Sequence, residues 1–214
     1  MTALPDVAPD PQTGRPDADA VAGALRVHGA CRLPDWPGPG LRADLRADLE
    51  RAQAAGALRP AAVGRGAARG LHAGIRNDAT LWLDDPRCGA PAREFLAHLD
   101  GLRRDLNRLL YLGLDECEAH YAAYPPGGGY ARHRDRFRDS DARVVTLVSY
   151  LNEDWREDDG GRLRLWLEDG AETTLLPAGG SVCFLSELEH EVLPAHRERR
   201  SIAAWFRRGG GGLR

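Results

Sequence analysis

The chain has 214 residues, which is enough for one domain with a sizeable hydrophobic core. Charged residues make up 29% of it but the formal net charge is only −3, so neither nucleic acid nor an anionic membrane is expected as a partner. No apolar run approaches the roughly 18 residues that a membrane-spanning helix needs.

The first half of the chain is expected to be mainly helical. Residues 1–16 are rich in Pro and Asp, so a disordered tail without a secretion signal is expected there. A single domain should then occupy residues 17–207, followed by a glycine-rich tail over 208–214. Apolar residues at helical spacing predict helices over 17–27, 41–58 and 92–112. Short strands are predicted at 28–33 and 74–83.

The segment 59–73 is rich in Gly, Ala and Arg and has no hydrophobic period. Long loops without structure of their own are uncommon inside compact domains and are often functional. Two interpretations stay open, a mobile lid and a solvated connector.

The second half of the chain changes to a strand pattern. Strands are predicted over 116–124, 130–135, 143–152, 162–167, 172–176, 181–185, 189–193 and 200–207. In one of them Leu163, Leu165 and Leu167 alternate with polar or aromatic residues. Helices followed by many short strands predict an α+β fold, a double-stranded β-helix (jelly roll) braced by N-terminal helices.

Two potential metal ligands, His133 and Asp135, stand two residues apart in the predicted strand over 130–135. Side chains at this spacing point the same way in extended backbone, so the imidazole and the carboxylate would lie side by side. Such a pair suits ferrous iron. The arginines at 132, 134, 136 and 138 would form a solvated cationic face opposite. The alternative is a charged edge strand with a surface histidine.

His190, in a predicted strand near the C-terminus, offers a third ligand. Two histidines and one carboxylate on one face of iron leave three positions open, for dioxygen and a chelating 2-oxo acid. The guanidinium of Arg199 can bind the distal carboxylate of such an acid. His196 is a competing ligand, although Pro194 beside it indicates an exposed turn. Surface or core positions are expected for the other histidines, His28, His72, His98 and His120.

These residues belong to a longer pattern. It comprises Ile75-Arg76 with Asp78 and Trp82, Tyr124-Pro125-Pro126-Gly127, Tyr130, His133, Asp135, Arg143, Thr146, the run Tyr150-Leu151-Asn152 with Asp154-Trp155, Gly160-Gly161, Leu163, His190-Glu191-Val192, Pro194, Arg199 and Trp205. The pattern closely resembles the 2-oxoglutarate- and iron(II)-dependent prolyl hydroxylases. The nearest branch is the one with the hypoxia-inducible-factor prolyl hydroxylases and their bacterial relatives. The resemblance implies a dioxygenase that hydroxylates the 4-position of a prolyl residue.

Site roles follow from the resemblance residue by residue. It implies His133, Asp135 and His190 as iron ligands. It implies that Arg199 and Tyr150 hold the distal carboxylate of 2-oxoglutarate. Its implied pocket walls are Tyr124, Thr146, Leu163 and Trp205. Its implied substrate-entrance residues are Arg76, Arg143 and Trp82, with the 59–73 loop closing over a peptide. Tyr150 could instead be a plain core residue, and Arg143 an ion-pair partner of Asp78.

The implied cofactor is iron(II), with 2-oxoglutarate and dioxygen as cosubstrates and ascorbate as a supporting reductant. The implied partner is a proline-bearing protein or peptide, for which a translation factor such as elongation factor Tu is one expectation. One alternative is the same chemistry on free proline or another small metabolite. Another is a non-catalytic metal-binding jelly roll that acts as a sensor. The sequence leaves the oligomeric state open.

Composition also suggests where the protein works. Four scattered cysteines without a Cys-X-X-Cys pair are most simply free thiols in a reducing cytoplasm. The chain has no lysine and abundant alanine and glycine, which suggests a GC-rich bacterial genome.

Overall fold

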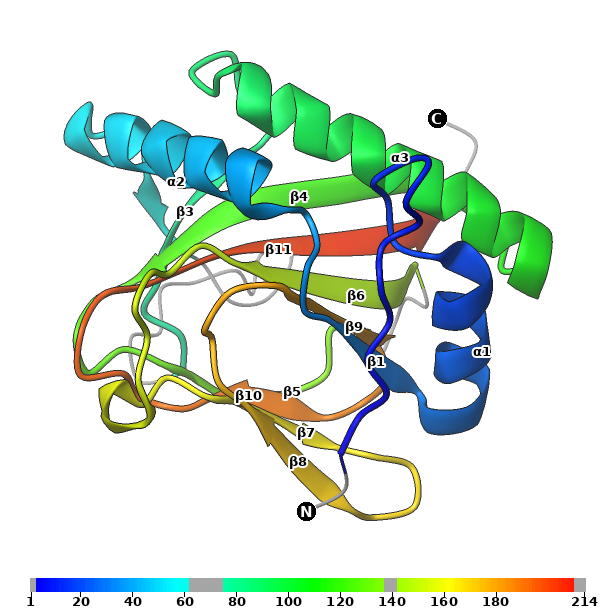
Figure 1. The fold of residues 1–214 in the computed structure, drawn as a ribbon. Coiled ribbons are helices and arrows are strands. Elements are labelled where there is room, and N and C mark those ends of the chain that lie inside the picture. Colours follow the sequence, from blue (N-terminus) through cyan, green and yellow to red (C-terminus); the bar gives the residue numbers. More distant parts are fainter. Residues whose placement is uncertain (1–2, 62–74, 137–141, 210–214) are drawn as a thin grey trace.

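The fold is built from two antiparallel sheets, with three helices covering the outer side of the larger one (Figure 1). The computed structural model describes residues 3–61, 75–136 and 142–209. Among these residues no helix is long and apolar enough to span a membrane.

The helices are α1 (Ala18–His28), α2 (Pro39–Ala54) and α3 (Ala90–Leu110). The side chain of Asp17 accepts the Ala20 N–H and begins α1, and Gly29 ends it with a φ of 70°, a left-handed conformation that glycine adopts without strain. Buried leucines of α2 and α3 belong to the helix–sheet core, together with residues of α1 and of the larger sheet. The predicted helices are therefore confirmed, with boundaries shifted by a few residues.

The larger sheet has the strand order β1-β9-β6-β11-β4-β3-β2, and the smaller sheet has the order β5-β10-β7-β8. The strands are β1 (Ala30–Leu33), β2 (Arg59–Pro60), β3 (Ala79–Trp82), β4 (Leu114–Tyr124), β5 (Tyr130–His133), β6 (Arg143–Tyr150), β7 (Leu163–Trp166), β8 (Glu172–Leu175), β9 (Ser181–Leu185), β10 (His190–Val192) and β11 (Arg199–Arg208). This arrangement confirms the predicted α+β jelly roll.

Alternation along β11 separates the two faces of the larger sheet. Ile202, Ala204 and Phe206 are fully buried in the core beneath the helices. Arg199, Ser201 and Trp205 point to the opposite face and line a pocket between the sheets. One strand thus contributes both to the helix–sheet core and to the space where the candidate ligands lie.

The N-terminal segment packs along the outer edge of β1. The Val7 N–H donates to the Arg32 carbonyl at 2.8 Å, and the Arg32 N–H donates to the Pro5 carbonyl at 2.9 Å. Leu4 and Val7 are buried. The expectation of disorder is therefore wrong for residues 3–16, because an open sheet edge offers backbone partners and an apolar surface that composition does not reveal.

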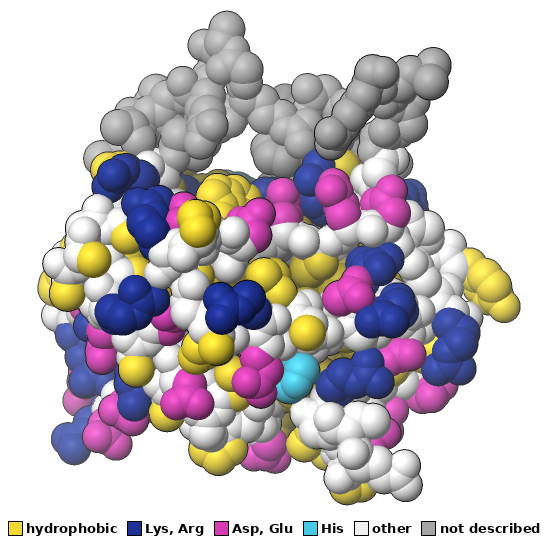
Figure 2. All heavy atoms as spheres, turned by 90° about the horizontal axis from the view of Figure 1, so that it is seen from above, with side chains coloured by type: hydrophobic (Ala, Val, Ile, Leu, Met, Phe, Trp, Pro, Cys, Tyr) yellow, Lys and Arg dark blue, Asp and Glu magenta, His cyan; other side chains and the backbone are white. Residues whose placement is uncertain are grey.

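Two surface features of the structure differ from the predictions. Arg59 and Pro60, in the expected 59–73 loop, form β2 and pair with β3, while residues 62–73 lie outside the described part. The expected cationic face is largely neutralised, because Arg132 and Arg134 pair with Glu189, and Arg136 pairs with Glu187. Position 138 is not described. On the helical face, basic and acidic side chains are likewise interspersed (Figure 2).

A buried carboxylate in α2 organises the helix layer. Asp48 accepts the Gly89 N–H at the start of α3 at 2.9 Å and the hydroxyl of Tyr121 in β4 at 3.0 Å. Burial by itself would raise the pKa of Asp48, but the Gly89 N–H, Arg51 and Tyr121 hold that pKa below its ordinary value. One side chain therefore joins two helices and the sheet.

We expect Asp48→Ala to lower the free energy of unfolding by roughly 2–4 kcal/mol, because it leaves a buried hydroxyl and a helix-terminal N–H without an acceptor. Urea unfolding followed by circular dichroism measures the change. The matched control is Asp44→Ala, which truncates an exposed carboxylate in the same helix and should cost no more than about 0.5 kcal/mol. Equal losses in the two variants would contradict the assignment.

Candidate active site

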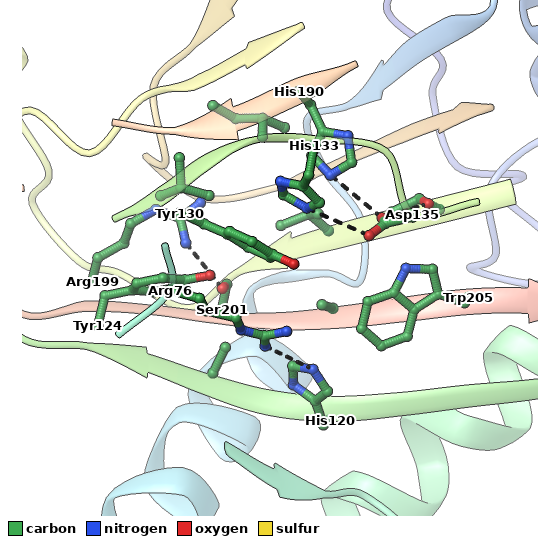
Figure 3. Close-up of a pocket in the computed structure, with 16 residues that line it drawn as sticks. Arg76, His120, Tyr124, Tyr130, His133, Asp135, His190, Arg199, Ser201 and Trp205 are labelled. Atoms are coloured by element: carbon green, nitrogen blue, oxygen red, sulfur yellow. Dashed lines mark hydrogen bonds and ion pairs between the residues drawn. The ribbon is translucent and has the colours of Figure 1, made fainter. Parts of the chain in front are cut away.

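Three potential metal ligands converge between the two sheets. β10 pairs with β5 so that His190 lies directly opposite His133, and Asp135 follows β5 two residues later (Figure 3). The Nε2 atom of His133 lies 3.6 Å from Asp135 Oδ1, and Nε2 of His190 lies 3.4 Å from Asp135 Oδ2. Ligand atoms of all three residues lie within 4.8 Å of one another, and no other such group occurs in the described part of the chain. The arrangement fits a single metal ion.

Backbone contacts fix the orientation of both imidazoles. His133 Nδ1 lies 2.7 Å from the Ala131 carbonyl, and His190 Nδ1 lies 3.0 Å from the Leu188 carbonyl. A carbonyl can only accept, so in each ring Nδ1 carries the proton and Nε2 presents its lone pair to the centre. Metal-binding histidines are commonly held by such a contact on the far nitrogen.

The charges at the centre also suit a cation. Burial lowers the pKa of His133, and neighbouring His190 lowers it further. Burial would raise the pKa of Asp135, but His190 and His133 hold it well below its ordinary range. Burial opposes protonation of His190, yet the carboxylate raises its pKa above the ordinary value. A metal ion can replace that proton as the partner of the Asp135 carboxylate.

A buried cation lies beside the metal centre. Arg199 is 1% exposed, its Nε donates to the Gly161 carbonyl at 3.0 Å, and its Nη1 donates to the Ser201 hydroxyl at 3.1 Å. Its Nη2 and the buried hydroxyl of Tyr150 have no partner among the described residues. Burial raises the pKa of Tyr150 to about 12, so the hydroxyl keeps its proton.

These two orphaned donors test whether the pocket fits a 2-oxo acid. Unpaired polar atoms in an enclosed site destabilise the protein unless a ligand satisfies them. In the described part of the chain no carboxylate forms an ion pair with Arg199, so its charge is open to an acidic ligand. A dicarboxylic acid that reaches the metal with one end and Arg199 with the other would satisfy both donors. The pocket fits 2-oxoglutarate.

The structure brings most of the predicted site residues into one pocket. Its lining includes these predicted residues: Arg76, Tyr124, His133, Asp135, Thr146, Leu163, His190, Arg199 and Trp205. Tyr150 lies behind Arg199, whose guanidinium carbon is 5.4 Å from the ring centroid. The competing ligand His196 is exposed, and its Nδ1 contacts the Asp158 carbonyl instead. Position 72 lies outside the described residues.

Two of the residues expected at the substrate entrance, Arg76 and Arg143, form ion pairs with neighbouring carboxylates. Arg76 binds Asp78 in a bidentate manner at 2.5 and 2.8 Å. Arg143 pairs with Glu118 at 2.6 Å and stacks over Trp205 at 3.7 Å, so the alternative pairing of Arg143 with Asp78 is wrong. Asp78 lies just before β3, two residues from Arg76, whereas Arg143 on β6 and Glu118 on β4 meet across the sheet.

His120 is a pocket residue that the sequence did not identify. It is 3% exposed, and its ring lies against both Trp82 and Trp205, with centroid distances of 5.2 Å. Its Nδ1 donates to the Tyr121 carbonyl at 3.0 Å, so Nε2 is the acceptor that faces Arg76 Nη2 at 3.4 Å (Figure 3). The sequence could have identified His120, because side chains alternate along a strand and His120 lies four residues before Tyr124. Both side chains therefore point to the same face of β4.

Two histidines and a carboxylate on one side of an ion, with open positions opposite, define the class of non-haem iron(II) oxygenases. Residues 119–207 match the family model of the 2OG-Fe(II) oxygenase superfamily. The chain belongs to this superfamily, whose members use iron(II), 2-oxoglutarate and dioxygen.

Solved structures give a closer comparison. A Pseudomonas putida prolyl-4-hydroxylase is 42% identical with a TM-score of 0.81, over 89% of this chain and 99% of that one. A Trichoplax adhaerens prolyl hydroxylase, solved with a peptide fragment of the hypoxia-inducible factor oxygen degradation domain, is 27% identical with a TM-score of 0.79, over 89% of this chain and 88% of that one.

Among relatives compared by sequence, human Egl nine homolog 1 is 33% identical over 141 residues. These residues span 62% of this chain but only 33% of the human protein.

The buried His120 should make stability depend on pH. Burial and the nearby Arg76 lower its pKa from 6.5 to about 4. Between these values the unfolded chain binds more protons than the folded protein, so stability falls as the pH falls from about 6.5 to about 4. We expect this loss to reach roughly 3 kcal/mol in the metal-free protein.

The neutral variant His120→Gln should lack this part of the loss. Urea unfolding of both metal-free proteins at about pH 7 and about pH 4.5 measures the difference between them. Parallel pH dependences would show that His120 is not held neutral by the fold.

Proposed function

We propose that the chain is an iron(II)- and 2-oxoglutarate-dependent prolyl 4-hydroxylase that acts on proline in a polypeptide. The observation that carries the proposal is the combination of the His133–Asp135–His190 cluster with two orphaned buried donors, on Arg199 and Tyr150. In the overall reaction one oxygen atom enters the substrate C–H bond. The other enters succinate, as 2-oxoglutarate loses carbon dioxide.

His133, Asp135 and His190 would hold iron(II), which supplies the oxidative chemistry together with 2-oxoglutarate and dioxygen. The protein's own part is positioning. Arg199 and Tyr150 would bind the distal carboxylate of 2-oxoglutarate and so fix its distance from the metal. Tyr124 and Leu163 would form walls that exclude water from the cosubstrate. Both are at most 4% exposed.

Aromatic walls support a prolyl substrate. His120 and Trp205 line one side of the pocket, and Trp82, which is not itself a lining residue, packs against both rings, with the two indole centroids 6.5 Å apart. Flat apolar faces suit a pyrrolidine ring, which has no charge of its own when it is part of a peptide. The indole N–H of buried Trp205 has no partner among the described residues and could donate to a peptide carbonyl.

The surroundings of Trp82 favour a polypeptide over a free metabolite. Trp82 is 43% exposed and also borders a separate open groove of about 580 Å³ between β4 and α3, whose lining includes Glu116, Glu118 and Asp100. A single amino acid would need a closed pocket, whereas a peptide needs space on both sides of the reacting residue. The two solved relatives, a prolyl-4-hydroxylase and a prolyl hydroxylase in complex with a peptide fragment, support the same proposal.

The non-catalytic alternative receives less support. A metal-binding sensor has no use for a buried arginine without an acidic partner, and such an arginine destabilises a protein that binds no anion. We further infer a bacterial cytoplasmic enzyme, in keeping with four free cysteines and a lysine-free composition. A translation factor such as elongation factor Tu is a candidate substrate, and ascorbate a candidate supporting reductant.

We expect the purified protein to form succinate from 2-oxoglutarate only with iron(II), and to add one oxygen mass to prolyl residues in a bacterial lysate. Peptide mass spectrometry identifies the modified residue. His133→Ala should abolish both products because it removes a metal ligand, whereas Arg134→Ala, which alters an exposed neighbour, should retain them. Oxygen added only to free proline or another small metabolite would contradict the polypeptide substrate.

We expect Arg199→Ala to raise the KM for 2-oxoglutarate on the order of 10- to 100-fold or more, because a buried charge partner of the carboxylate is lost. Steady-state kinetics with varied 2-oxoglutarate measures the change. Arg200→Ala is the matched control, since Arg200 pairs with Glu198 and Glu50 outside the pocket. An unchanged KM in Arg199→Ala would exclude Arg199 as the carboxylate anchor.

A further inference from the structure

A chain of two buried hydroxyls lies behind the carboxylate of the metal centre. Thr146 Oγ1 in β6 is 2.9 Å from Asp135 Oδ2, and the Oγ atom of Ser186, which follows β9, is 2.8 Å from Thr146 Oγ1. Thr146 is 1% exposed and Ser186 is 0% exposed. Water therefore cannot easily replace either contact.

The direction of these hydrogen bonds follows from counting protons. An ionised carboxylate only accepts, so Thr146 must use its single hydroxyl proton on Asp135. Thr146 then has only lone pairs to offer Ser186, and Ser186 must be the donor in their contact. The relay thus runs from Ser186 through Thr146 to Asp135, and each hydroxyl polarises the next.

Asp135 depends on this relay because it is the one ligand of the three that lies outside a strand. His133 ends β5 and His190 begins β10, so the pairing of those strands fixes both histidines. Asp135 comes two residues after the end of β5 and lies in no strand. Apart from the two histidines, Thr146 is the only described residue whose side chain forms a hydrogen bond or ion pair with this carboxylate.

The scaffold behind Asp135 is rigid. Thr146 lies in the middle of the larger sheet, paired with Phe184 on β9 and with Trp205 on β11. The Ser186 N–H donates to the Val144 carbonyl, and the Ser186 carbonyl accepts the Arg136 N–H, each at 3.0 Å. The sheet therefore holds both the Asp135 side chain and the backbone just after it.

We propose that Thr146 is a positioning residue: its hydrogen bond to Oδ2 fixes the orientation of the Asp135 carboxylate, so that this carboxylate binds the metal through one oxygen. This inference rests on the proposed metal site. A carboxylate that bound through both oxygens would occupy one of the three positions needed by a chelating 2-oxo acid and dioxygen. The hydroxyl thereby keeps a coordination position open as well as orienting a ligand.

The test compares Thr146→Val, which keeps the shape and removes the hydroxyl, with Thr146→Ser, which keeps the hydroxyl. Cobalt(II) is titrated into each metal-free protein and followed by its visible absorption. We expect Thr146→Val to weaken cobalt binding roughly 10- to 100-fold, the usual effect of losing a partner of a metal ligand. Thr146→Ser should stay within about threefold of the wild type, a difference of one modest hydrogen-bond contribution or less.

A second readout addresses the open coordination position. In the iron(II)-loaded proteins without oxygen, 2-oxoglutarate is titrated at saturating iron. We expect Thr146→Val to need at least about tenfold more 2-oxoglutarate for its visible charge-transfer band, and Thr146→Ser to behave as the wild type. A role confined to folding would lower the melting temperature of Thr146→Val and leave both titrations unchanged, which would overturn the inference.

Two controls keep the outcome unambiguous. If wild-type protein and His133→Ala bind cobalt(II) equally, the metal site itself is wrong and the proposed function fails with it. If the wild type binds tightly and Thr146→Val does too, only the role of Thr146 fails. Should Thr146→Val not fold, Ser186→Ala replaces it. This variant should weaken cobalt binding roughly threefold, and an unchanged affinity would overturn the relay.

Discussion

The antiparallel pairing of β5 with β10 is the interaction on which the site depends. It sets His133 opposite His190, although the two residues are far apart in the sequence. A shift by one residue would turn one of the imidazoles to the other face of the sheet, because side chains alternate along a strand. The hydrogen-bond register of two short strands therefore decides whether the ligands meet.

The larger sheet supplies other residues of the pocket. β6 contributes Thr146, and β11 contributes Arg199 and Trp205, all on the face opposite the helices. The helices bury the other face of the same strands, so the sheet cannot bend to accommodate changes in the pocket. Asp48 strengthens this layer by joining α2, α3 and β4. Rigidity of the helix layer is thus part of how the site keeps its geometry.

Two of the buried polar atoms that have no partner among the described residues lie side by side where a ligand would lie. The free Nη2 of Arg199 and the hydroxyl of Tyr150 destabilise the ligand-free protein. They become favourable when an acid occupies the pocket. The fold therefore gives up some stability in its empty state and regains it on binding, as is common at functional sites.

Local patterns in the sequence predicted most of the secondary structure and the metal site. Leucine spacing predicted two of the three helices, alternation predicted most strands, and the His-X-Asp spacing indicated a metal site, because each signal acts within a few residues. Only the tertiary structure decided that residues 5–7 pack along a strand edge, that Asp48 is buried and that His120 enters the pocket. It also decided that Thr146 points its hydroxyl at Asp135. These outcomes depend on groups distant in sequence, whose burial and hydrogen-bond partners exist only once the sheets have formed.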